Sequence, residues 1–234
     1  RRLGSDVEVI EYLPRILPGM DNEVADKFLK IMQKQGLTFK LNHAVERAKI
    51  ENKKVSLSVK DTITGDTKNL EADVVLVAVG RKPNTEGLGL DSLNMEIDRN
   101  GFITTNEKFQ TSISNIYAIG DVIRGPMLAH KAEEDGVAAV EIINGEAGHV
   151  DYNLVPGIVY TSPEVAVIGK TEEELKENQI SYNKGIFPLS ANSRAKAISH
   201  TEGFVKILSD KSTDKILGAH MIGHEAGTVI HELS

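Results

Sequence analysis

The longest unbroken apolar run in the chain, Val74 to Val79, limits the folds that the sequence can adopt. It follows Asp73, is rich in β-branched residues and ends at Gly80, so it predicts a fully buried strand of a parallel sheet. It is far shorter than the roughly 20 residues that a membrane helix needs. The sequence therefore predicts an α/β fold with no transmembrane segment.

The residues before this run predict a β-α-β unit followed by a β-ribbon. Asp21 stands where a helix N-cap is expected, and apolar residues follow it at helical spacing until Gly36, which is placed to end the helix. Strand patterns cover residues 6–11, 37–41 and 55–59, and a turn at 64–66 returns the chain towards residue 70.

The second half of the chain alternates short strands with helices. A brief strand at 116–119 ends at Gly120-Asp121, and a helix is predicted over residues 128–143. Thr171 and Glu174 have the spacing of a capping box, and a last helix is expected from about His224. Further strands are predicted at residues 158–160, 165–168, 204–208 and 216–221.

Charge and composition exclude several classes of function. The chain has 27 basic and 34 acidic residues, a net charge of −7, and its charges alternate without basic clusters. Nucleic acid and anionic membrane are therefore not expected as partners. There is no cysteine, so the chain itself carries no disulfide, thiolate metal site or thiol chemistry. His220, His224 and His231 match no zinc template, and no metal site is predicted.

Three places at the ends of predicted strands are candidates for cofactor binding. Glu11, at the tip of the strand predicted over residues 6–11, has the position of a carboxylate that accepts hydrogen bonds from both hydroxyls of an NAD ribose. Gly80 brings backbone close to the edge of the sheet where α/β folds bind ligands. Asp121 follows a strand, and residues 127–130 open the next helix with free N–H groups. Pattern alone leaves ordinary alternatives open: an exposed glutamate, a strand-to-turn glycine, and a turn followed by a helix cap.

Taken together and in order, these residues resemble the flavin-dependent disulfide oxidoreductases. Within that family the similarity is greater to the enzymes that oxidise dihydrolipoamide than to glutathione or mercuric reductase. The matching stretches are Leu3-Gly-Ser-Asp-Val-Glu-Val-Ile-Glu11, Met32-Gln-Lys-Gln-Gly36, Asp73-Val-Val-Leu-Val-Ala-Val-Gly-Arg-Lys-Pro83, Asn115-Ile-Tyr-Ala-Ile-Gly-Asp121, Gly125-Pro-Met-Leu-Ala-His-Lys-Ala-Glu133 and Ala191-Asn-Ser-Arg-Ala-Lys196.

The resemblance implies three domains of an α/β protein. Residues 1–83 would be part of a Rossmann-like NAD-binding domain, and residues 84–151 a central domain that contacts FAD. Residues 152–234 would be an α+β dimerisation, or interface, domain truncated at its C-terminus. The resemblance thus implies a partial FAD/NAD(P)-binding Rossmann-like domain plus a dimerisation domain.

The resemblance also assigns cofactor contacts to individual residues. On the NAD side these are Glu11, Val45 and Gly80. Asp121 would bond the ribityl chain of FAD, and Met127, Leu128, Ala129 and His130 would follow the edge of the flavin ring. The helix N-terminus there would stabilise negative charge on the reduced ring.

The implied activity is the oxidation of dihydrolipoamide to lipoamide with reduction of NAD. The implied partners are a second copy of the chain, in a homodimer, and the lipoyl domains of 2-oxo-acid dehydrogenase complexes. The compartment would be a bacterial cytoplasm or, alternatively, the mitochondrial matrix.

The chain also departs from the family pattern. The redox-active cysteine pair, the glycine motifs of both dinucleotide sites and the catalytic His-Glu dyad match nothing in it, so no catalytic residue is assigned. The chain is therefore interpreted as a fragment that is inactive alone. The alternatives are another pyridine nucleotide–disulfide reductase and a non-catalytic dimerisation fragment.

Overall fold

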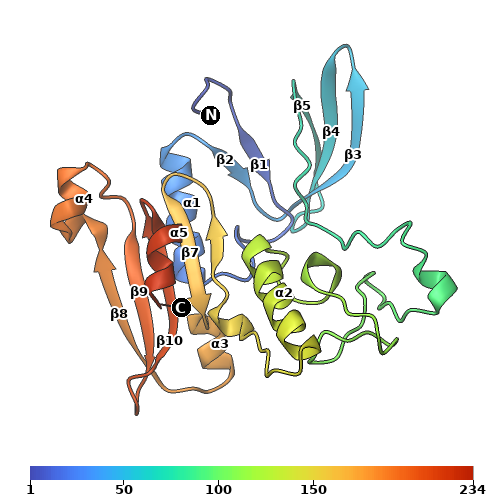
Figure 1. The fold of residues 1–234 in the computed structure, drawn as a ribbon. Coiled ribbons are helices and arrows are strands. Elements are labelled where there is room, and N and C mark those ends of the chain that lie inside the picture. The colour runs from blue at the N-terminus through green and yellow to red at the C-terminus, as the bar shows by residue number, and fades with distance from the viewer. Residues whose placement is uncertain (234) are drawn as a thin grey trace. The chain divides into compact units, whose positions relative to one another are not determined.

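The computed structural model describes residues 1–233, which form two compact units (Figure 1). The first unit joins Arg1–Val77 to the chain from Pro156 onwards, and the second is Ala78–Val155. The domain boundaries given by the resemblance, after residues 83 and 151, stay predictions.

The predicted β-α-β unit is confirmed. Strand β1 (Glu8–Ile10) and strand β2 (Thr38–Lys40) pair in parallel, and helix α1 (Asn22–Lys34) connects them. Asp21 is the N-cap of α1, and its Oδ1 accepts hydrogen bonds from the N–H groups of residues 23 and 24 at 3.0 and 3.4 Å. The apolar residues at helical spacing are buried, as an amphipathic helix requires.

The ribbon is a three-stranded antiparallel sheet. Its strands are β3 (His43–Glu51), β4 (Lys54–Asp61) and β5 (Thr67–Ala72), in that order. The sequence predicted β4 and the return along β5, but it gave no indication of β3, whose residues are largely exposed.

The buried parallel strand predicted for residues 73–79 is wrong. The segment is not a strand, and Val74, Leu76 and Val79 are 82%, 86% and 93% exposed. A strand buried on both faces needs hydrogen-bonding neighbours, and the only parallel pair within residues 1–233 is β1 with β2. Within residues 1–233, the segment is therefore apolar but has no neighbouring strands with which to pair.

The largest sheet has five antiparallel strands in the order β6-β7-β10-β9-β8. Its strands are β6 (Gly157–Val159), β7 (Glu164–Gly169), β8 (Tyr182–Pro188), β9 (Phe204–Asp210) and β10 (Ile216–Gly223). Only β8, an exposed edge strand, was not predicted. The short helices of this region are α3 (Glu172–Glu177), α4 (Ser193–Ala197) and α5 (Ala226–Val229), with 3₁₀ turns at Leu189–Ala191 and Ile230–Leu233.

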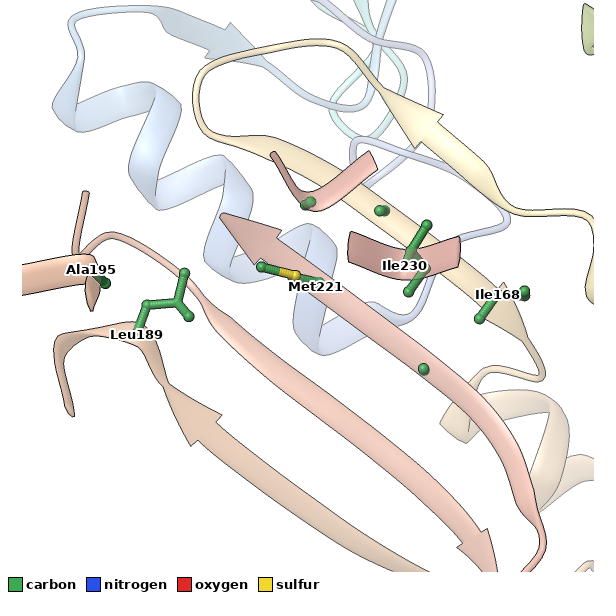
Figure 2. Packing of buried hydrophobic residues seen from close by; sticks show 8 residues of the cluster. Ile168, Leu189, Ala195, Met221 and Ile230 are labelled. Carbon is green, nitrogen blue, oxygen red and sulfur yellow. The ribbon is translucent and has the colours of Figure 1, made fainter. Parts of the chain in front are cut away.

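Alternate residues of the central strands supply two separate cores, one on each face of this sheet. Val165 and Ile222 pack with the buried face of α1, whereas their neighbours Ala166 and Met221 pack with Ile230 on the opposite face. Figure 2 shows the second core, with Ile168, Met221 and Ile230 close together. The sheet is therefore buried on both faces although it is antiparallel.

A buried ion cluster joins α1 to the sheet. Lys206 of β9 is fully buried, and its Nζ lies 2.9 Å from both oxygens of Asp21 and 2.6 Å from Oε2 of Glu172. Burial alone would raise the pKa of Glu172, but the hydrogen bonds led by that from Lys206 outweigh it and lower the pKa. His220 of β10 lies beside this cluster, and burial lowers its pKa. Its Nε2 is 3.1 Å from the carbonyl oxygen of Lys170.

The capping box is confirmed at the start of α3. The Thr171 hydroxyl accepts from the N–H of Glu174 at 3.2 Å, and the Glu174 carboxylate accepts from the N–H of Thr171 at 2.7 Å. The predicted last helix is the short α5, which begins two residues after His224.

The second unit is mostly loops packed on one helix. Helix α2 (Ala129–Ile143) closely matches the predicted helix, and 3₁₀ turns lie at Leu90–Leu93, Gly120–Val122 and Tyr152–Leu154. The strand predicted at 116–119 is wrong, because Tyr117 forms only an isolated bridge with Gln110. The core of the second unit comprises Met95, Ile103, Phe109, Ala118, Ile123, Ala138 and Ala139. Across residues 1–233, no helix is long and apolar enough to cross a membrane.

Candidate cofactor site

Glu11 lies directly after β1, at the carboxyl end of the parallel pair. Its main chain continues the pairing, since its N–H donates to Lys40 O and its carbonyl accepts from His43 N, both at 2.9 Å. Its carboxylate Oε1 accepts a hydrogen bond of 2.8 Å from the N–H of Leu13. That bond fixes the side chain at the strand end, where a carboxylate can accept from ribose hydroxyls.

Val45 belongs to the same corner of the first unit as Glu11. It is a residue of β3, two positions beyond the His43 that bonds Glu11, and it is 49% exposed. An exposed valine offers an apolar surface against which the adenosine part of a dinucleotide can pack.

Gly80 belongs to the second unit, so its predicted place on the NAD side stays a prediction. Its φ of +123° is open to glycine and strained for other residues. The next residue, Arg81, donates from Nη2 to Asp121 Oδ2 at 2.5 Å and from Nη1 to Met127 O at 3.0 Å. Arg81 thus ties together two of the positions predicted to contact the flavin.

Helix α2 begins two residues after Met127, whose carbonyl oxygen Arg81 contacts. Leu128 is the N-cap residue, and its side chain makes no hydrogen bond to the N–H groups of the first turn. Ala129 is exposed, and Met127, Leu128 and His130 are half-buried. Asp121 and the opening of α2 therefore lie in one compact unit, with Arg81 connecting Asp121 to Met127.

The polar groups at Asp121 and at the start of α2 fit a flavin nucleotide. Asp121 presents a carboxylate with a 35% exposed side chain, which can accept hydrogen bonds from polyol hydroxyls. The helix N-terminus that follows suits an electron-rich ring atom or an anion. Three residues that sequence reasoning did not assign support this arrangement: Arg81, Lys131 and Asp135. The last two have a visible signal, since their spacing of four residues places them on one face of α2.

Metal binding has no support in the described part of the chain. Within residues 1–233, no three His, Asp or Glu side chains come together in a group that could hold a metal ion. His200 and His224 do stack, with ring centroids 4.2 Å apart, but this pair has no third ligand group.

Two family models cover the chain almost from end to end. The pyridine nucleotide-disulphide oxidoreductase model matches residues 1–136, and the dimerisation-domain model of the same group matches residues 155–234. The chain belongs to the pyridine nucleotide-disulphide oxidoreductases. The resemblance stated from the sequence is thereby confirmed, as is the mixed α/β class with its dinucleotide-binding and dimerisation parts.

Relatives of the chain include curated enzymes of plants. The chain is 55% identical over 231 residues to dihydrolipoyl dehydrogenase 2, mitochondrial, of Arabidopsis thaliana. The match covers 99% of the chain and 46% of the relative. The chain is 53% identical over 231 residues to leghemoglobin reductase of Glycine max, covering 99% and 44%. The chain thus spans about half the length of the curated relatives it matches.

Solved structures agree in fold. LpdA from Mycobacterium tuberculosis superposes with a TM-score of 0.90 at 26% identity, over 99% of this chain and 50% of the LpdA chain. The flavoprotein disulfide reductase RclA from Escherichia coli gives a TM-score of 0.88 at 27% identity, over 98% and 52%.

Proposed function

We propose that this chain is part of a dihydrolipoyl dehydrogenase, which oxidises dihydrolipoamide to lipoamide and reduces NAD. The observation that carries the proposal is the identity of 53–55% to dihydrolipoyl dehydrogenases of two plants across 99% of the chain. FAD, when bound, supplies the electron transfer between a disulfide and the pyridine nucleotide.

The residues of this chain hold and orient the two cofactors in the proposal. Glu11 accepts from the ribose hydroxyls of NAD, and Val45 and Gly80 are the other residues proposed to contact NAD. Asp121 accepts from the ribityl hydroxyls of FAD. The residues along the flavin edge are Met127, Leu128, Ala129 and His130. No residue of the chain is assigned a catalytic role, and the cysteine-free chain alone is expected to be inactive.

The proposed partners follow from the same relatives. The dimerisation domain matched over residues 155–234 supports a homodimer. Lipoyl domains of 2-oxo-acid dehydrogenase complexes are the proposed substrate carriers. The mitochondrial names of the plant relatives favour the mitochondrial matrix over a bacterial cytoplasm as the compartment.

The test uses the full-length protein that contains this chain, purified with its flavin. NAD reduction is followed at saturating dihydrolipoamide, and NADPH oxidation with glutathione disulfide is the matched comparison. We expect the first reaction and only background for the second. Activity with glutathione disulfide alone would favour another disulfide reductase, and a protein without flavin absorbance would favour a non-catalytic dimerisation unit.

A further inference from the structure

Both backbone polar groups of Gly120 are bound by side chains of α2. The N–H of Gly120 donates to Asp135 Oδ2 at 3.0 Å, and its carbonyl oxygen accepts from Lys131 Nζ at 3.1 Å. Lys131 and Asp135 also pair with each other at 2.7 Å, and both side chains are fully buried. The carbonyl bound by Lys131 belongs to the peptide that joins Gly120 to Asp121. This bond therefore holds the orientation of that peptide plane, and with it the direction of the Asp121 side chain.

The turn at Gly120 lies close against helix α2. Gly120 has a φ of +70°, and a Cβ at this position would meet the Cβ of Ala132 at 3.1 Å. The second oxygen of Asp135 accepts from the Tyr152 hydroxyl at 2.8 Å. Burial and this bond raise the pKa of Tyr152, so its hydroxyl keeps the proton that it donates. Every charged group of the network therefore has its partner.

A buried ion pair is a poor device for stability alone. Removing two charges from water costs several kcal/mol per ion, and apolar residues of similar volume often replace such a pair at no loss of stability. What an apolar pair cannot do is bind the N–H and carbonyl of one particular residue. The arrangement therefore points to control of the direction of the Gly120–Asp121 turn.

We propose that Lys131, Asp135 and Tyr152 are positioning residues that hold the Gly120–Asp121 turn so that Asp121 is aimed at the FAD ribityl chain. The inference rests on the proposed FAD site. It adds three residues that touch no cofactor themselves and act through Asp121.

The experiment compares flavin affinity with folding in the full-length protein. Lys131→Met/Asp135→Leu replaces the pair by apolar side chains, and Tyr152→Phe removes one hydroxyl. Glu134→Gln, an exposed carboxylate on the same helix, is the matched control. The readouts are the FAD dissociation constant of each apoprotein, from flavin fluorescence, and its melting temperature. We expect the double variant to bind FAD about tenfold or more weakly. Tyr152→Phe should weaken FAD by a few fold, and Glu134→Gln should bind FAD and melt like the wild type. The double variant should also melt at a lower temperature, because the N–H and carbonyl of Gly120 lose their side-chain partners.

A double-mutant cycle separates positioning from a purely structural role. If the network acts through Asp121, the same substitutions made in an Asp121→Ala background change the dissociation constant less than about twofold. Fully additive effects would overturn the proposal, as would an unchanged affinity in the double variant and in Tyr152→Phe. A wild-type protein that binds no FAD would instead refute the proposed function itself.

Discussion

Lys206 is a buried ammonium whose charge is balanced by the carboxylates of Asp21 and Glu172. Lys206→Met would leave these carboxylates together without their shared cation, so we expect a loss of about 3–5 kcal/mol in the free energy of unfolding. Lys184→Met is the matched control, because Lys184 contacts Glu172 at 3.1 Å with a 39% exposed side chain. It should cost less than about 1 kcal/mol. Urea unfolding of the chain measures both, and equal losses would contradict the prediction.

The same cluster makes stability depend on pH. The pKa of Glu172 is lower in the folded chain than its ordinary value, so folding favours the ionised form. Its contribution is fully present above the ordinary pKa of 4.5 and is lost progressively as the pH falls from there towards the lower folded pKa. We expect Glu172→Gln to be less stable at pH 7 and to lose less on going to pH 4. Parallel pH profiles for the two proteins would show that the carboxylate is not responsible.

Glu11 gives a prediction about cofactor choice. In the full-length protein, Glu11→Arg should weaken NAD by about 1–3 kcal/mol and improve NADP, since a guanidinium pairs with a 2′-phosphate that the carboxylate repels. The ratio of kcat/KM for the two cofactors is the measurement. Glu11→Gln, which keeps the shape and removes the charge, is the control and should shift the ratio less. An unchanged ratio in Glu11→Arg would refute the ribose role.

At the scale of elements, the sequence predicted a helix correctly wherever residues close in sequence supply its capping hydrogen bonds. Asp21 and Gly36 bounded α1 correctly, and Thr171 with Glu174 marked the start of α3, because caps are made by neighbours in sequence. The run at 73–79 failed because a buried strand depends on neighbours that the run does not encode.

The candidate site also contains residues that the sequence could predict and contacts that it could not. Glu11 and Asp121 were visible as carboxylates at predicted strand ends. The contact of Arg81 with Asp121 crosses 40 residues, and only the folded chain brings the two together. Exposed strands such as β8 carried no alternation, since neither of their faces is buried.

Two glycines in the five-stranded sheet region make opposite predictions. Gly203, just before β9, has a φ of +113°, and a Cβ there would lie 1.9 Å from the carbonyl oxygen of Ile222. Gly203→Ala should therefore cost about 2 kcal/mol or more, from strain and from displaced backbone. Gly185 in β8 has open space around its Cβ position, so Gly185→Ala should change stability by less than about 0.5 kcal/mol. Urea midpoints that shift equally would contradict this contrast.

At the scale of the whole molecule, the match to a dimerisation-domain model predicts that the chain associates with a second copy of itself. The dimerisation domain is present over residues 155–234, and interfaces of obligate dimers typically bury more than about 2,000 Å². We expect a two-fold dimer that forms through residues after Tyr152. Light scattering across a range of micromolar concentrations should show twice the chain mass at the upper end. A single-chain mass at every concentration would contradict the prediction.

The buried lysine of β9 also has a consequence for strand alignment. Phe204, Lys206 and Leu208 are the buried residues of β9 and alternate along the strand, so they share one face. In a strand with only apolar residues at such positions, a slip by two residues would keep the same face buried and cost little. Here the slip would carry an ammonium away from two fixed carboxylates and place a hydrocarbon between them. Lys206 thus disfavours a two-residue slip of β9, in the way that one polar residue can set the register of paired helices.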